Sequence, residues 1–261
     1  MLHLKLFIKM LSLSFLKDIE YRANLYAMLF SGLIWVFIPL VLFKAIYLNI
    51  DTIAGWTWHD MLLLIGSYTI IDSLMMFLLI NNMNQLQSDI MDGKLDQLLT
   101  KPIDSQFYVS FKNVNYSQLF NVFPGILMIV YVFYTTPLEI NITTLLIYLI
   151  YLILGMLIYY SVWFIWTALS FWLPNIRSRE RLFLDAILMA RFPLPIYKGL
   201  FGILFTYIIP LAVIANPAAL VLMGKLTWVE GIVVLILALV MVSISRIVWQ
   251  KGLNSYSSAG G

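Results

Sequence analysis

Residues 81–104 read NNMNQLQSDIMDGKLDQLLTKPID and form the longest polar interruption between the apolar segments of this chain. Four apolar residues within it follow the i, i+4, i+7, i+8 spacing of one helix face: Met91, Leu95, Leu98 and Leu99. Gly93 weakens such a helix near its start and Pro102 cannot continue it, so we expect an amphipathic unit of about two turns. A short helix outside the bilayer needs a surface to cover its apolar face. We therefore interpret this stretch as the contact site for a soluble partner protein.

The composition places the chain in the membrane. Hydrophobic residues make up 62% of the 261 residues and charged residues 11%, whereas soluble domains have about 45–50% and about 25%. The chain contains no cysteine, which excludes disulfides, thiolate metal ligands and cysteine nucleophiles. Its two histidines, His3 and His59, are far apart in sequence and have no neighbouring ligand set. We accordingly predict an integral membrane protein without a metal site.

The apolar segments predict an all-α polytopic protein with six transmembrane helices in a single domain, residues 1–261. A helix needs about 20 apolar residues to cross a bilayer, and the segments that approach this length are residues 25–43, 61–80, 114–134, 143–169, 199–214 and 229–248. The fifth is short and contains Pro210, and a further apolar piece follows Asn216-Pro217. Interrupted segments of this kind can also enter and leave the membrane on one side where protein covers their backbone.

The charges predict the orientation. On the six-span topology, every Lys and Arg except Lys44 and Lys225 lies on one side, which the positive-inside rule makes cytoplasmic. Residues 1–24 are amphipathic and basic, as expected of an interfacial helix. We thus expect a plasma-membrane protein with residues 1–24, the loop 81–104 and the tail 249–261 in the cytoplasm. The arginines of residues 174–198 are assigned to topology and to membrane lipids, and no nucleic-acid partner is expected.

Asp72 is the only acidic residue deep inside a predicted span. An ionised carboxylate there costs roughly 2.5–3.5 kcal/mol on insertion scales. Tyr68 and Thr69 lie one helical turn earlier and share a face with it. Two interpretations stay open: these three residues form a polar patch on a substrate path, facing cationic cargo, or Asp72 is a protonated or hydrogen-bonded carboxylate that locks two helices together.

Motifs for nucleotide chemistry are absent from the sequence. There is no GxxxxGK[ST] phosphate loop, and neither G-x-S-x-G nor HExxH occurs. The polar loops are also too short to fold as catalytic domains. We expect no enzymatic activity and no cofactor in this chain, so that ATP and Mg, if they drive it, are bound by another polypeptide.

Three stretches carry a resemblance to a known family. IMDGKLDQLLTKPID (90–104) resembles a signature of permease subunits of type 2 ABC exporters, in the branch related to daunorubicin-resistance permeases. RFPLPIYKGLFGILFTYIIPLAVIANPAALVLMGKL (191–226) is similar to a second signature of that branch, and WQKGLNSYSSAGG (249–261) is similar to its usual ending. The resemblance extends over nearly the whole chain and, with its three motifs in order, is fairly specific.

The resemblance implies a dimer of permeases, with a second copy or a different chain, served by two cytoplasmic ABC ATPase subunits. It also implies a coupling helix seated on the ATPase, formed by Met91, Gly93, Leu95, Asp96, Leu98, Leu99, Lys101 and Pro102. A bacterial exporter of a drug, antibiotic, peptide or lipid-like amphipathic molecule is the expected function, with a part in drug or antibiotic resistance. The alternatives are an ion-gradient-driven secondary transporter that uses Asp72, and a membrane scaffold or immunity protein that transports nothing.

Overall fold

The computed structural model describes residues 9–16, 22–96, 100, 102–138, 140–173 and 179–256. These residues fold into helices without a β-strand in the described ranges, which confirms the all-α class. The helices are α2 (Arg22–Tyr47), α3 (Trp58–Met91), α5 (Ser105–Phe111), α6 (Val122–Thr135), α7 (Ile142–Ala168), α8 (Arg179–Ile187), α9 (Gly199–Ile203), α10 (Asn216–Leu222) and α11 (Trp228–Ser255). Short 3-10 turns precede α6 (η1, Tyr116–Asn121), follow α7 (η2, Leu169–Phe171), and follow α8 (η3, Leu188–Arg191; η4, Leu194–Ile196).

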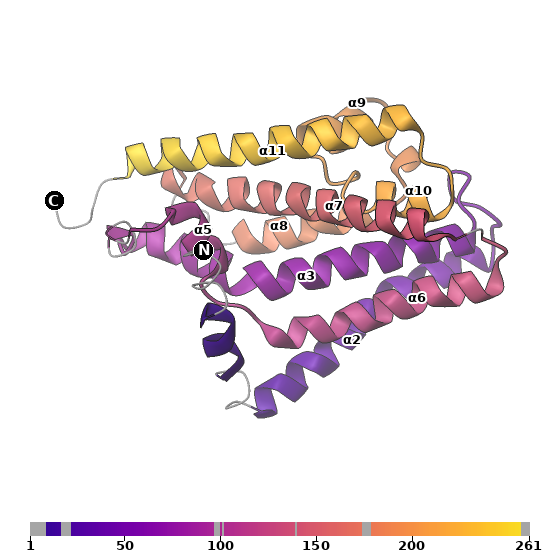
Figure 1. Cartoon of the computed structure of the whole chain (residues 1–261), viewed down its shortest axis with the longest axis horizontal. Coiled ribbons are helices and arrows are strands. Elements are labelled where there is room, and N and C mark those ends of the chain that lie inside the picture. The colour runs from indigo at the N-terminus through magenta and orange to yellow at the C-terminus, as the bar shows by residue number, and fades with distance from the viewer. Residues whose placement is uncertain are drawn as a thin grey trace.

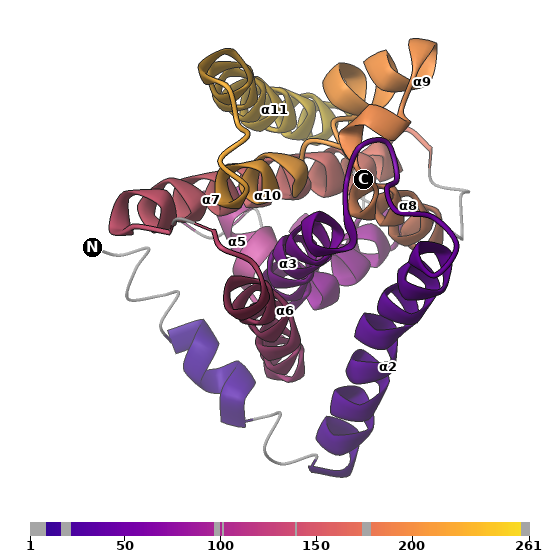
Figure 2. The same cartoon turned by 90° about the vertical axis from the view of Figure 1, so that its right-hand side faces the viewer.

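The long helices run side by side along the length of the molecule (Figure 1). In the view along that axis, α3 lies near the centre, α2, α6, α7 and α8 surround it, and α11 packs on the outer side of α7 (Figure 2). We name the two ends of this bundle after the ends of α3, as the Trp58 end and the Met91 end. Because α3 has neighbours on all sides, it contributes more buried hydrophobic side chains to the core than any other helix of the described residues.

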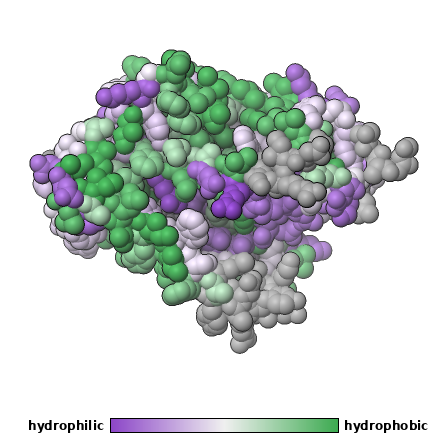
Figure 3. Space-filling model, turned by 180° about the vertical axis from the view of Figure 1, so that it is seen from behind, coloured by the Kyte–Doolittle hydropathy of each residue, from purple (hydrophilic) through white to green (hydrophobic). Residues whose placement is uncertain are grey.

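Five helical segments of the described residues are long and apolar enough to cross a membrane. They are Phe30–Tyr47, Trp58–Met91, Tyr116–Thr135, Ile142–Phe171 and Trp228–Ser255, which correspond to the first, second, third, fourth and sixth predicted spans. Seen from behind, hydrophobic surface covers most of the half toward the Trp58 end, and hydrophilic surface gathers in the centre and toward the Met91 end (Figure 3). The structure therefore confirms the polytopic membrane class that the composition predicts.

The predicted fifth span, residues 199–214, is not one continuous helix. It forms α9, a π-helical turn (η5, Leu204–Ile208) and a non-helical stretch that leads into α10. Pro210 has no N–H for a helical hydrogen bond, which explains why the helix ends there. The side chain of Asn216 then satisfies backbone groups that the break leaves free: its Nδ2 donates to Ala212 O and Phe192 O, and its Oδ1 accepts from Leu194 N.

The polar residues after Ile80 continue α3 instead of starting a loop. Asn82 is fully buried, and its Nδ2 donates to the carbonyls of Ser110 and Asn113 while its Oδ1 accepts from Asn113 N. Lys112 forms an ion pair with Asp89, at 3.0 Å. These contacts dock the polar face of α3 onto residues 110–113, which explains how a polar sequence remains helical up to Met91.

The N-terminal segment is helical over residues 9–16. Val114 N donates to Ser14 Oγ and Tyr116 OH donates to Leu11 O, so this helix packs against the segment that enters η1. Leu13 and Leu16 are exposed on its other side. An exposed apolar face beside basic residues suits an interfacial helix, although its depth in a membrane stays a prediction.

Candidate functional site

A cavity of about 510 Å³ lies between α2, α3, α8 and η1, about halfway along the bundle. Tyr68, Thr69 and Asp72, the three residues predicted for a substrate path, all line it. Its remaining wall is mostly apolar and is contributed by residues such as Trp35, Val36, Met76, Ile80, Leu184 and Leu188. The structure thus brings the predicted polar patch together at a hollow between helices.

Two tyrosine hydroxyls hold the Asp72 carboxyl group. Tyr159 OH of α7 donates to Asp72 Oδ1 at 2.9 Å, and Tyr68 OH donates to the same oxygen at 3.3 Å. The sequence spacing predicts the contact with Tyr68, whereas Tyr159 comes from another helix. Because Tyr159 links α7 to α3 through Asp72, the helix-locking interpretation of Asp72 describes part of its role, and its position on the cavity leaves the substrate-path interpretation open as well.

Arg191 is the site residue that the sequence analysis misplaced. We expected it in a cytoplasmic loop, as a topology determinant, but its guanidinium lies over the Tyr68 ring, with Cζ 4.8 Å from the ring centroid. The chain reaches this position because α8 turns back along the bundle, where Phe183 stacks on Trp163 of α7 with ring centroids 5.0 Å apart. The amphipathic pattern of residues 181–197 was the available signal that this stretch packs against protein.

Asn121 adds an unpaired acceptor to the cavity wall. Its side chain is 8% exposed, and its Nδ2 donates to Gln118 Oε1 at 3.2 Å. Its Oδ1 is buried and accepts no hydrogen bond in the described structure. A Cβ added to Gly32 would lie 2.5 Å from the Asn121 amide, so the α2 backbone passes directly over this group. Buried acceptors without partners are rare in folded proteins, which makes Asn121 a functional candidate.

The predicted coupling segment follows α3 at the Met91 end. Met91 is the last residue of α3 and is 47% exposed, and Gly93 takes a positive φ of 72° that ends the helix. Leu98, Leu99 and Lys101 lie outside the described residues. Asp96 and Pro102 are exposed.

Leu95 corrects one part of the sequence prediction. We expected it on an exposed stripe with Leu98, but Leu95 is 0% exposed and belongs to the hydrophobic core of this chain. The chain leaves the helical path at Gly93, so the i, i+4 spacing from Met91 no longer places Leu95 on the face of Met91. Its side chain is therefore not available for an outside partner.

Helix α5 connects this segment to two spanning helices. Arg246 of α11 donates to both carboxylate oxygens of Asp104, at 3.1 and 2.5 Å. Gln106 donates to Tyr160 OH of α7 at 3.1 Å, and Trp249 Nε1 of α11 donates to Ser105 Oγ at 3.0 Å. Residues 104–106 are thus linked to α7 and α11 by direct hydrogen bonds.

The Asp104–Arg246 pair predicts an acid-dependent loss of stability. Burial disfavours ionisation of Asp104, but hydrogen bonds from Arg246 and from Phe107 N, with the positive charge of Arg246, outweigh it and lower the pKa of Asp104. A carboxyl group whose pKa is lower in the folded state stabilises the fold above its unfolded pKa, about 3.9, and loses this contribution as the pH falls through the folded value.

We expect the wild-type chain to be more stable than Asp104→Asn at pH 7, and the difference to shrink as the pH falls below about 4. Thermal unfolding of both chains in detergent across this range is the measurement. A difference that stays constant with pH would show that ionisation of Asp104 has no part in its stabilising effect.

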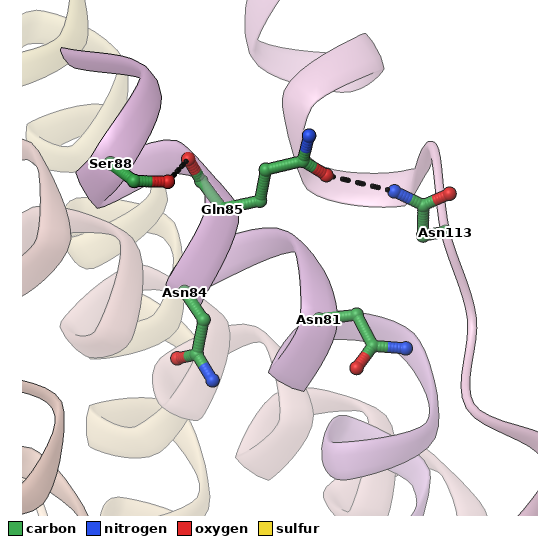
Figure 4. Close-up of a pocket in the computed structure, with 5 residues that line it drawn as sticks. All are labelled: Asn81, Asn84, Gln85, Ser88 and Asn113. Atoms are coloured by element: carbon green, nitrogen blue, oxygen red, sulfur yellow. Dashed lines mark hydrogen bonds between the residues drawn. The ribbon is translucent and has the colours of Figure 1, made fainter. Parts of the chain in front are cut away.

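A second pocket, of about 470 Å³, lies on the polar extension of α3 and is lined by Asn81, Asn84, Gln85, Ser88 and Asn113 (Figure 4). Asn113, in the loop before η1, donates through Nδ2 to Oε1 of Gln85 in α3 at 3.1 Å. These lining residues are all uncharged. We assign them to anchoring this loop on α3, together with the neighbouring Asn82.

Five helical segments long and apolar enough to span a membrane, with a cavity between α2, α3, η1 and α8 that contains charged residues, are typical of polytopic helical membrane proteins. A comparison with protein families makes this specific: the model of the ABC-2 family transporter protein matches residues 33–260, and the chain belongs to this family. A search of curated proteins found no match, and a search of solved structures found none either. The family assigned from three sequence motifs is thus confirmed, and the daunorubicin-resistance branch stays a prediction.

Membership has two direct consequences. The chain is the permease component of an ABC transporter, a membrane transport subunit and not itself the ATPase. Membrane components of this family work with a cytoplasmic ATPase. This agrees with the lack of a phosphate loop in the sequence.

Proposed function

We propose that this chain is the membrane subunit of an ATP-driven exporter for an amphipathic molecule. The observation that carries the proposal is the family match over residues 33–260. In this proposal two cytoplasmic ATPase subunits bind ATP and Mg, and two permeases, identical or different, form the transport path. The charge distribution supports an orientation with both termini, and hence the Met91 end, in the cytoplasm. The plasma membrane of a bacterium is the proposed location, as the resemblance implies.

Residues 92–104 are the proposed contact with the ATPase. They lie between two anchors, since Asp89 pairs with Lys112 before the segment and Asp104 pairs with Arg246 after it. A push from the ATPase on this segment would reach α3 directly along the chain, the segment before η1 through the first pair, and α11 through the second. We infer that closure of the ATPase dimer rocks the paired permeases between inward-facing and outward-facing states through these two contacts.

The cavity beside Asp72 is the proposed substrate path. Its apolar wall suits the body of an amphipathic molecule, and Asp72, Tyr68 and Thr69 provide polar contacts near the middle of the predicted second span, residues 61–80. A hydrogen-bonded carboxyl group at this depth, next to a hollow, is typical of substrate pathways in membrane proteins.

The contact with the ATPase predicts different effects of three substitutions. If Leu98 is buried in an ATPase groove packed like a core, Leu98→Ala should weaken the complex by about 2–5 kcal/mol. Lys101→Ala should weaken it by only about 0.2–1 kcal/mol, as is usual for exposed charges. Leu95→Ala should instead lower the thermal stability of the isolated permease, because Leu95 is buried within this chain.

Co-purification of the ATPase with each tagged variant, together with thermal unfolding of each variant alone, separates these effects. Leu98→Ala should lose the ATPase at unchanged thermal stability. If the same amount of ATPase is recovered with Leu98→Ala as with the wild type, the proposed contact is wrong.

A further inference from the structure

Four charged residues line the cavity, Asp72, Arg181, Asp185 and Arg191, and two of them, Asp72 and Arg191, adjoin the buried Tyr68. Arg191 stacks on Tyr68, and the described residues form no ion pair between Arg191 and Asp72. The tyrosine hydroxyls both donate to Asp72 Oδ1, and within the described residues Asp72 Oδ2 accepts no hydrogen bond. Tyr68 lies between the two groups, with its ring against Arg191 and its hydroxyl on Asp72. The two charges therefore compensate each other without direct contact, and each keeps polar atoms that a bound molecule can use.

Asn121 lines the same cavity. Its Oδ1 is buried and accepts no hydrogen bond within the described residues, and Gly32 of α2 lies directly over its amide. We therefore assign Asn121 to the cavity wall and not to the binding groups. Asp72 Oδ2 can accept a hydrogen bond, whereas Arg191 can only donate. The site therefore suits a ligand with N–H donors and, separately, with acceptor oxygens.

Apolar side chains complete the wall. Trp35 and Val36 of α2 face the cavity together with Met76 of α3 and Leu184 of α8. The cavity volume, about 510 Å³, is in the range of sites for small organic ligands. A hydrocarbon chain packed against this wall would gain about 25 cal/mol of binding free energy per Å² of apolar surface removed from water.

We propose that this cavity binds a zwitterionic amphiphile, a molecule with an ammonium group, a nearby acidic group and a hydrocarbon tail. The ammonium group donates to Asp72, the acidic group accepts from Arg191, and the tail lies on the Trp35 wall. A cation alone makes no contact with Arg191 of opposite charge, an anion alone makes none with Asp72, and a neutral amphiphile makes neither. The inference rests on the proposed role of the cavity as the substrate path and specifies its substrate class.

The test uses the purified full-length chain in a neutral detergent, with four titrated probes of similar chain length. They are lysophosphatidylethanolamine (zwitterionic), lysophosphatidic acid (anionic), an alkylamine (cationic) and a monoacylglycerol (neutral), and the readout is the ligand concentration that gives half of the thermal stabilisation. We expect the zwitterion to bind at least about tenfold more tightly than each of the others, since tenfold corresponds to about 1.4 kcal/mol. Equal binding of all four would overturn the proposal.

Two variants should each lower the affinity for the zwitterion by removing one of its two charge contacts. Asp72→Asn should bring the zwitterion down to the affinity of lysophosphatidic acid, because the ammonium loses its counter-charge. Arg191→Gln should lower the affinity for the zwitterion to that for the alkylamine, because the acidic group loses its counter-charge. Lys198→Gln is the control, since it also removes a positive charge but Lys198 is exposed and does not line this cavity, and it should keep the wild-type order. If Asp72→Asn does not fold, the wild-type order and Arg191→Gln still test the proposal, and an unchanged preference in Arg191→Gln contradicts it.

Two further probes separate the sources of such a ligand. Glycerophosphoethanolamine has the charges without the tail and should not bind, so binding of this probe as tight as that of the lysolipid would overturn the assignment of the apolar wall. 2-Aminotetradecanoic acid has an ammonium and a carboxylate on one tail. Tighter binding of the lysolipid supports a membrane phospholipid as the source, and tighter binding of the amino acid supports a peptide-like amphiphile.

The binding assay contains no ATP and no ATPase, so its outcome is distinguishable from that of the proposed function. Charge-selective binding without a co-purifying ATPase would contradict the proposed exporter function and support the amphiphile site. A co-purifying ATPase together with unselective binding of the probes would support the exporter function and contradict the zwitterion site.

Discussion

Asp89→Ala should destabilise the chain by about 3–5 kcal/mol, the cost of leaving a buried charge without its partner. Asp89 and Lys112 are paired at 3.0 Å, and their side chains are only 10% and 11% exposed. The pair joins the extension of α3 to the segment that leads into η1 and α6. Unfolding free energies in mixed micelles measure the effect, and ATPase co-purification should fall with them because the proposed contact segment begins three residues later.

The chain provides a matched control in the neighbouring pair. Asp92 and Lys94 lie 2.7 Å apart, but their side chains are 50% and 63% exposed. Exposed pairs are usually worth about 0.2–1 kcal/mol, so Asp92→Ala should change stability little. The double variant Asp89→Leu, Lys112→Met should recover most of the loss, since apolar groups of similar volume can replace a buried pair. Equal effects of Asp89→Ala and Asp92→Ala would contradict the burial argument.

Gly155→Ala should produce the second large loss. A Cβ at Gly155 in α7 would lie 2.1 Å from Ile214 O, a backbone atom of the break before α10. Backbone cannot move aside as a side chain does, so the substitution must push residues 211–215 away from α7. Overpacking typically costs about 1–3 kcal/mol and occasionally more, and this geometry favours the upper part of that range. The measurement is the same unfolding experiment.

Gly231→Ala is the control for this prediction. Its Cβ would lie 2.3 Å from Tyr151 OH, the end of a side chain that is only partly buried and can rotate. We expect a much smaller loss there, even though the initial overlap is similar. If the two variants lose the same stability, the close backbone approach at Gly155 does not limit the packing of the broken segment.

The sequence predicted the helices that are long, apolar and uninterrupted, because a membrane span is defined by local composition. Five of the six expected spans correspond to such helices. The fifth was the difficult one, since Pro210 and Asn216 indicate a break but do not say where the chain goes next. The side-chain hydrogen bonds of Asn216 to Phe192 and Ala212 fix that path, and they join residues distant in sequence.

The candidate site shows the same division between local and distant contacts. Helical spacing placed Tyr68 and Thr69 on the face of Asp72, and all three line the cavity. Tyr159, Asn121 and Arg191 come from other elements and could not be found by spacing. Arg191 was misleading in particular, because a charged residue in a polar stretch ordinarily lies outside the membrane. Here its guanidinium packs on the Tyr68 ring.

Leu95 shows how one residue ends a periodic pattern. The stripe through Met91, Leu95 and Leu98 assumes an unbroken helix, but Gly93 has a φ of 72° and redirects the chain. The glycine was recognised in the sequence as a weak point of a helix. Its effect on which leucines face inward depends on the packing around Leu95, which only the three-dimensional structure gives.

The central claim is that a separate ATPase drives this permease through residues 92–104. Affinity purification of the solubilised full-length chain from its native membrane, with identification of the proteins that accompany it, tests this most directly. The account predicts recovery of an ATPase with a GxxxxGK[ST] phosphate loop, with or without a second permease, and its loss in Leu98→Ala. Recovery of the chain without any ATPase, and transport that follows an ion gradient, would contradict the account and favour a secondary transporter that uses Asp72.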